Sequence, residues 1–322
     1  MKKLFTILAV AAAVVACQKN EIVSLDKGEA INFASFVNNS TRADAATDPS
    51  YSTTADKGVA LTKFNVYGAV NGVNIFNGND VTKGDAAYGA AWTLNGAKQY
   101  WIAGADYEFV AVVDGNKSGV TTTNLNTAGI PTTIDYTVDG ATDLLCARVV
   151  RTDNTDTSVV SFNFSHLLSK VKFSVKNTTS ADATNYRFVL TTAKLTNIYS
   201  EGVYAVNTDA WTPEDTMREY TLENLTINSN AVQYHSKEVL LIPGEQKVGV
   251  YVKANIEASD DNGATWKVVS EVEKTFSDVV APEKATAYNF IVELGVGEEI
   301  KFTAATMPEW ADGDGNDDTV LQ

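Results

Sequence analysis

Short apolar runs alternate with polar residues along most of the chain, at the period of β-strands. These runs are rich in Val, Ile, Phe, Tyr and Thr, and clusters of Gly, Asn and Asp separate them, as in strands joined by turns. The clearest runs are residues 64–70, 99–113, 142–150, 158–164, 170–176, 186–198 and 238–257. No segment keeps an apolar period of 3.6 residues over several turns. The sequence therefore predicts an all-β fold.

Local patterns within this fold predict one strand type and one turn. In KVKFSVK, the apolar residues Val171, Phe173 and Val175 alternate with lysine and serine. This alternation predicts a strand with one buried face and one wet face. The pair Asn262 and Gly263 is a strong signal for a hairpin turn.

A domain boundary is predicted near Ser165, because strand groups of comparable length lie on either side of it. A chain of 322 residues also has a length typical of about two domains. Two antiparallel β-sandwiches joined by a short connection would account for the pattern. The predicted division is residues 43–165 and residues 166–322.

The chain begins with an apolar run that ends at a cysteine. Lys2 and Lys3 precede this run, and small residues end it just before Cys17, which is the pattern of a secretory signal. The run is shorter than the roughly 20 apolar residues that a membrane-spanning helix needs. The order Val-Val-Ala-Cys resembles the lipobox of bacterial lipoproteins. That resemblance implies a signal peptide over residues 1–16 and a lipid anchor, such as palmitate, on Cys17. An ordinary signal peptide with an accidental cysteine is the alternative.

Three different segments follow Cys17. A polar stretch at residues 18–29 predicts a tether, and AINFASFV at residues 30–37 predicts an isolated strand. Residues 38–58 are built from Asn, Ser, Thr, Ala and Asp, which predicts an exposed loop.

Composition argues against nucleic-acid binding. The chain has 25 basic and 40 acidic residues, a formal net charge of −15, and loss of Lys2 and Lys3 with the signal would make it −17. Such a surface repels polyphosphate, whereas nucleic-acid binding needs a basic footprint. Once Cys17 is lipidated, Cys146 is the remaining thiol, so no intramolecular disulfide is expected. Its apolar neighbours predict a small buried side chain.

Residues for catalysis or metal binding are sparse in the sequence. His166 and His235 are the two histidines, and neither lies at metal-ligand spacing from Cys, Asp or Glu. No phosphate-binding loop or nucleophile elbow occurs. We therefore expect no enzyme activity, no cofactor and no metal. The aromatic residues Trp92, Tyr100 and Trp101 are expected in the core, but if exposed they would form a platform for sugars.

The chain resembles the fimbrillins, the pilin lipoproteins of type V bacterial fimbriae. The resemblance rests on the lipobox at Cys17 and on five later stretches that cover both predicted domains. These are YWIAGADYEFVAVV, TDLLCA, FSHLLSKVKFSV, VLLIPGEQKVGVYV and YNFIVELGVGEEIKFTAATMPEW. It implies two tandem transthyretin-like antiparallel β-sandwiches, export as an outer-membrane lipoprotein precursor, and maturation by an arginine-specific protease. It also implies assembly with other fimbrial subunits into an extracellular fimbrium.

The resemblance implies cleavage between Arg42 and Ala43 in the exposed loop; a solvated loop cation is the alternative for Arg42. Cutting there would release the preceding strand and open a groove for a strand from another subunit, which is donor-strand exchange. The apolar residues of the removable strand are Ile31, Phe33, Phe36 and Val37. If all four are buried, they contribute at most about 6–12 kcal/mol. Their shift of phase between Phe33 and Phe36 predicts a bulge or burial on two sides.

The other end of the chain leaves two assembly roles open. Ile300, Phe302 and Ala304 alternate in IKFTAATMPEW and would form a C-terminal donor strand that swings out, as in a stalk subunit. Residues after Trp310 offer only a meagre donor, so a tip subunit that accepts without donating is the alternative. Adhesion to a host or bacterial surface ligand is expected of a tip. Another class of protein fits the same sequence: a permanently lipid-anchored binder of glycan or peptide that does not polymerise.

Overall fold

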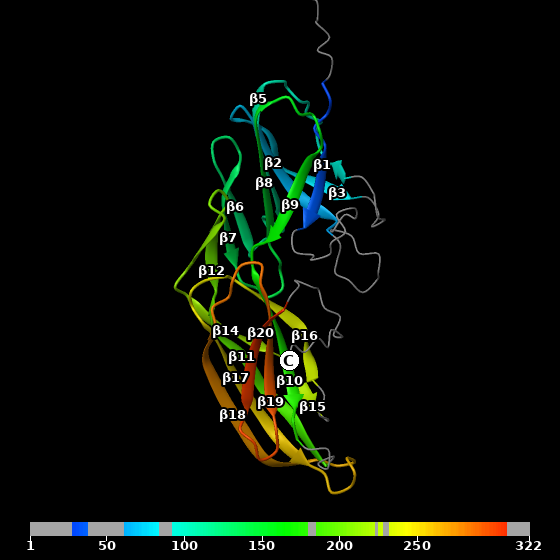
Figure 1. Ribbon diagram of the computed structural model, residues 1–322, viewed down its shortest axis with the longest axis vertical. Coiled ribbons are helices and arrows are strands. Elements are labelled where there is room, and N and C mark those ends of the chain that lie inside the picture. The colour runs from blue at the N-terminus through cyan, green and yellow to red at the C-terminus, as the bar shows by residue number, and fades with distance from the viewer. Residues whose placement is uncertain are drawn as a thin grey trace, which may run out of the picture.

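The computed structural model describes residues 28–37, 61–83, 92–179, 185–222, 225–227 and 232–307. Throughout these residues the regular secondary structure is β-strand, arranged in four sheets, which confirms the predicted all-β class. Figure 1 shows an elongated molecule with β1, β2, β5, β8 and β9 towards one end and β10, β11 and β17 to β20 towards the other. The described residues contain no helix of the length and apolarity that crossing a membrane requires.

The first sheet has seven strands in the order β1-β9-β8-β5-β2-β3-β4. Their bounds are β1 Phe33–Val37, β2 Lys63–Val70, β3 Val73–Lys83, β4 Trp92–Leu94, β5 Ala105–Val113, β8 Leu145–Asn154 and β9 Val160–His166. All neighbours are antiparallel except β1, which runs parallel to β9. Although β1 and β4 stand at opposite ends of this order, they contact each other. The sheet therefore curls until its edges meet at β1, and one apolar core fills the inside of the curl.

The second sheet has four strands in the order β13-β12-β7-β6 and shares a core with the first. Its strands are β6 Thr121–Leu125, β7 Pro131–Thr137, β12 Glu201–Ala205 and β13 Ala210–Pro213. The hairpin of β12 and β13 follows β11 along the chain, yet β12 pairs with β7. Residues from beyond the predicted boundary at Ser165 thus complete a sheet of the preceding half. The division itself, residues 43–165 and 166–322, stays a prediction.

Two further sheets enclose the third core, at the other end of the molecule. One has the order β16-β10-β19-β20, and the other has the order β14-β11-β17-β18, with β15 paired to β11. The bounds are β10 Ser169–Asn177, β11 Tyr186–Tyr199, β14 Met217–Leu222, β15 Leu225–Ile227, β16 Val232–Leu241, β17 Val248–Ala258, β18 Lys267–Val280, β19 Ala287–Leu294 and β20 Lys301–Met307. Asn262 and Gly263 both have positive φ between β17 and β18, which confirms the predicted hairpin turn.

The prediction of a wet face on KVKFSVK is wrong. Val171 and Phe173 point into the core as expected, but Lys170 is only 2% exposed and Ser174 is buried as well. Lys170 Nζ lies 3.0 Å from a carboxylate oxygen of Glu238 on the neighbouring β16. The alternation therefore gave the direction of each side chain correctly. The buried ammonium of Lys170 is compensated by an ion pair with a residue of another strand, which a period-2 pattern does not encode.

Candidate functional site

Residues 29–37, hereafter the N-terminal segment, close the gap between the two edges of the seven-stranded sheet. The Ile31 N–H donates to the carbonyl of Gln99 (2.9 Å), and the Trp101 N–H donates to the carbonyl of Glu29 (3.1 Å). The chain then continues as β1, which pairs in parallel with β9; Figure 1 shows the two strands side by side. The expected strand in AINFASFV is thus present, as the edge strand of the first sheet.

Phe33 is the centre of the packing between the N-terminal segment and the rest of the sheet. It is 5% exposed, and its ring lies 5.4 Å from that of Phe76, 6.0 Å from that of Phe109 and 5.8 Å from that of Phe162. Ile31, also buried, belongs to the same core. Two side chains of this kind contribute about 3–6 kcal/mol when buried.

The pairing of β1 with β9 shows no bulge, so of the two predicted explanations for the shift of phase only burial on two sides stays a prediction. The register advances one residue at a time from Phe33 opposite Val160 to Val37 opposite Phe164. Inward positions therefore follow strict alternation, and the third of them is Ser35, which is 1% exposed. Ser35 does not stand out in the pattern of apolar residues, although its spacing from Ile31 and Phe33 points to an inward position.

The beginning of the segment is held by polar and close backbone contacts. The Thr157 hydroxyl donates to the Glu29 carboxylate at 2.7 Å. A Cβ placed on Gly28 would lie 2.9 Å from the carbonyl oxygen of Trp101, so glycine allows the backbone to approach this closely. No sequence pattern identified Thr157, which lies 128 residues from Glu29.

The aromatic residues near the segment do not form an open platform for sugars. Trp101 is 7% exposed, the guanidinium of Arg151 lies 4.8 Å from its ring centroid, and Tyr107 packs against it with its edge at 4.8 Å. Trp92 packs 4.9 Å from Phe64. Both tryptophans therefore belong to the core, as expected. Tyr100 is 37% exposed, so the expectation of a core position is wrong for this residue.

The proposed donor residues lie at the opposite end of the molecule, in and just before β20. Ile300 is buried, and Phe302 stacks on Phe276 with ring centroids 5.1 Å apart. Ala304 is exposed. Strand β20 pairs only with β19 among the described strands, so it is an edge strand.

Several predicted residues fall outside what the structure describes. Cys17, Arg42 and Ala43 lie outside the described residues. Phe36 and Val37 belong to β1 by their backbone, but their side chains are not among those described. Their predicted roles stay predictions.

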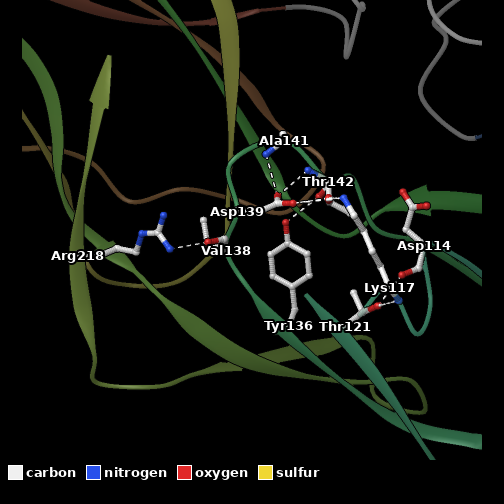
Figure 2. Close-up of polar contacts among 9 residues, drawn as sticks. All are labelled: Asp114, Lys117, Thr121, Tyr136, Val138, Asp139, Ala141, Thr142 and Arg218. Carbon is white, nitrogen blue, oxygen red and sulfur yellow. Dashed lines mark hydrogen bonds and ion pairs between the residues drawn. The ribbon is translucent and has the colours of Figure 1, made fainter. Parts of the chain in front are cut away.

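A polar cluster at residues 138–142, hereafter the polar junction, links the two ends of the molecule (Figure 2). Arg218 of β14 donates to the carbonyl of Val138 at 2.5 Å, and the Leu240 N–H donates to the carbonyl of Gly140 at 3.1 Å. Both donors belong to strands of the second half. The buried Tyr136 hydroxyl of β7 donates to the carbonyl of Thr142 at 2.7 Å.

Asp139 is the acceptor at the centre of the polar junction. It receives the N–H groups of Ala141 (2.9 Å) and Thr142 (2.7 Å) and lies 3.4 Å from the Lys117 ammonium. Burial by itself raises the pKa of Asp139, but a hydrogen bond from the Thr142 hydroxyl, together with those from the two N–H groups and Lys117, outweighs it and lowers the pKa to about 2. The carboxylate is therefore ionised at neutral pH and fixes the turn between β7 and β8.

The described residues offer no evident centre for chemistry. No group of three or more His, Cys, Asp or Glu side chains there is placed to hold a metal ion. His166 Nδ1 lies 2.6 Å from the Asp143 carboxylate, beside the polar junction. Cys146 is a free buried thiol, as predicted, and its burial raises its pKa to about 12.

The fold and this site together define a β-sandwich protein whose first sheet is completed by its own N-terminal segment. A fimbrillin-like family model matches residues 41–310. Because this match spans most of the chain, the chain belongs to the fimbrillin-like family, which places it among fimbrial proteins.

Solved structures of related fold agree with this assignment. A fimbrial protein from Bacteroides vulgatus superposes with a TM-score of 0.59 at 13% identity, over 87% of this chain and 99% of that chain. A protein assigned to cell adhesion from Bacteroides uniformis gives a TM-score of 0.53 at 17% identity, over 87% and 97%. One from Bacteroides ovatus gives 0.51 at 16% identity, over 88% and 98%. At such low identities, these superpositions show a shared fold alone. The search of curated proteins gave no match.

Proposed function

We propose that this protein is a fimbrial subunit, made as a precursor whose N-terminal segment occupies the place that a strand from another subunit takes after cleavage. The precursor is exported by the signal peptide of residues 1–16 and held at the outer membrane by lipid on Cys17. An arginine-specific protease cuts between Arg42 and Ala43. The mature subunit then joins the extracellular fimbrium and contributes to adhesion.

The observation that carries this proposal is the place of the N-terminal segment in the first sheet. Its loss would remove Phe33 from between Phe76, Phe109 and Phe162 and leave the edge of β9 without a partner. A groove with unpaired backbone groups and an apolar floor is a template for an added strand. The match to the fimbrillin-like family begins at residue 41, so the matched region excludes β1.

Cleavage comes first in this scheme because the segment is held firmly. The described side chains Ile31 and Phe33 alone contribute about 3–6 kcal/mol by burial, and the backbone hydrogen bonds to Gln99 and β9 add to it. While the segment is covalently attached, its effective concentration at the groove is high, and an outside strand competes poorly. Cutting the loop removes that advantage.

The supplier of the new strand is β20 of a second subunit. This strand lies at a sheet edge, and Ala304 is exposed although it shares a face with Ile300 and Phe302, so that face is only partly covered. Release of β20 also requires Ile300 and Phe302 to leave the third core, and insertion into the groove buries them again. Donation makes the protein a stalk subunit in this scheme.

Cleavage of a non-lipidated precursor lacking residues 1–17 tests the proposal. With an arginine-specific protease, the protein should give a product that begins at Ala43 and forms oligomers resistant to mild SDS. Arg42→Gln should stay uncut and monomeric, whereas Thr41→Ala, which keeps the arginine, should behave as the parent does. Oligomers of equal yield from Arg42→Gln would overturn the proposal. A cleaved monomer that binds polysaccharide would favour a glycan-binding surface protein instead.

A further inference from the structure

Ser35 is a polar residue in the most apolar part of the N-terminal segment. It is 1% exposed, follows Phe33 on the inward face of β1, and stands opposite Phe162 in the register with β9. Among the described residues its hydroxyl has no hydrogen-bond partner. The described side chains that pack around it, Phe33 and Phe162 among them, form an apolar core, so the position itself favours an apolar group.

A hydroxyl buried without a partner weakens the strand that carries it. Desolvation of such a group lowers the stability of the bound strand by a factor of about 5 to 150, which is the usual 1–3 kcal/mol expressed as an equilibrium constant. An alanine at the same place would keep the Cβ packing and lose only the hydroxyl. The segment is therefore held less tightly than its apolar contacts would allow.

The same chain contains a second strand with the same spacing and without the hydroxyl. Ile300, Phe302 and Ala304 follow one another at alternate positions, as Ile31, Phe33 and Ser35 do. The two stretches read IKFTA and INFAS, so both offer isoleucine and phenylalanine at the first two inward positions. They differ at the third inward position, where alanine replaces serine.

We propose that Ser35 lowers the stability with which the N-terminal segment is bound in the first sheet. After exchange, Ala304 of a second copy occupies the position of Ser35. In this arrangement the incoming strand runs parallel to β9 and places Ile300, Phe302 and Ala304 where Ile31, Phe33 and Ser35 were. Exchange then proceeds in one direction, because the new strand makes the same apolar contacts without a buried unpaired hydroxyl. This inference rests on the proposed strand exchange and specifies its register and direction.

The buried hydroxyl is tested first in the intact precursor, where no exchange is needed. Urea unfolding should show Ser35→Ala to be more stable than the parent, because the buried hydroxyl is gone. Ala34→Ser, which adds a hydroxyl at the neighbouring outward position, serves as the matched control and should change the midpoint little. A Ser35→Ala midpoint equal to or below that of the parent overturns the inference, whatever happens after cleavage.

Exchange is tested after cleavage with synthetic peptides of residues 300–306, added to protein that carries a fluorescent label on the N-terminal fragment. The parent peptide should release the fragment with an affinity about 5 to 150 times that of the Ala304→Ser peptide. A Thr303→Ala peptide, altered on the outward face, should match the parent. Release of the fragment from the Ser35→Ala protein should be slower by a similar factor.

The outcomes separate this inference from the proposed function. Equal affinities of the parent and Ala304→Ser peptides overturn the inference while leaving strand exchange intact. A fragment that no peptide releases, and that also stays bound when cleaved subunits are mixed, overturns the exchange itself and with it the role of Ala304. In that case a more stable Ser35→Ala precursor still supports the weakening effect of the hydroxyl.

Discussion

The ring of Phe33 stacks on the ring of Phe162 across the parallel pair of β1 and β9, with centroids 5.8 Å apart and planes inclined by 16°. The two residues are 129 positions apart in the chain, yet they form one wall of the first core. Because β1 is an edge strand, this wall is also the part of the core that a single cut in the chain can remove. In the proposed scheme, the stability of the precursor and its assembly after cleavage would therefore depend on the same contact.

Phe33→Ala should destabilise the precursor by about 3–5 kcal/mol, since a fully buried phenylalanine is lost and a cavity is left among three other rings. Urea unfolding of the uncleaved protein measures this change. Asn32→Ala, on the exposed side of the same segment, should cost under about 1 kcal/mol. A loss below 1 kcal/mol for Phe33→Ala would mean that the segment is not part of the cooperative core.

Gly28→Val should loosen the start of the N-terminal segment, because a Cβ there would come within 2.9 Å of the Trp101 carbonyl oxygen. The expected cost is about 1–3 kcal/mol, as for other forced contacts with backbone. Hydrogen exchange of the Trp101 amide, which donates to Glu29, should speed up while amides in β17 stay protected. Unchanged protection at Trp101 would show that the backbone shifts without strain.

The polar junction should make stability fall in acid. The folded pKa of Asp139 is lowered to about 2 from an ordinary value of 3.8, so its contribution is complete above about pH 4 and is lost as the pH falls towards 2. Asp139→Asn should cost about 1–2 kcal/mol at neutral pH, allowing for solvent screening of this half-open site. The difference between parent and variant should shrink between pH 4 and pH 2 in urea titrations.

Asp215→Asn, at an exposed bend, is the matched control for this experiment and should leave both the midpoint and its pH dependence nearly unchanged. A difference between the parent and Asp139→Asn that stays constant down to pH 2 would contradict the assignment of the acid loss to Asp139.

Cys146 should be unreactive in the native protein, because burial raises the pKa of its thiol to about 12 and little thiolate forms at pH 8. Iodoacetamide should modify the non-lipidated protein lacking residues 1–17 only after unfolding in urea, as mass spectrometry would show. Cys146→Ser should leave the protein folded but less stable, since it places a hydroxyl in the second core. Rapid alkylation under native conditions would indicate that this core opens readily.

The sequence by itself determined the all-β class, the hairpin turn at Asn262 and Gly263, and the inward direction of Ile31 and Phe33. These features follow from period-2 alternation and from local turn preferences, which depend on neighbouring residues alone. Cys17 and Arg42 were chosen from the sequence in the same way and lie outside the described residues.

Tertiary structure alone decided which strand each edge meets. It paired β1 with β9 rather than with a neighbour in sequence, brought β12 across to β7, and buried Lys170 beside Glu238. It also placed Ser35 where its hydroxyl has no partner among the described residues. Pairing between distant strands depends on long-range packing and on the entropy of closing long loops, and neither leaves a mark in the local pattern of residues.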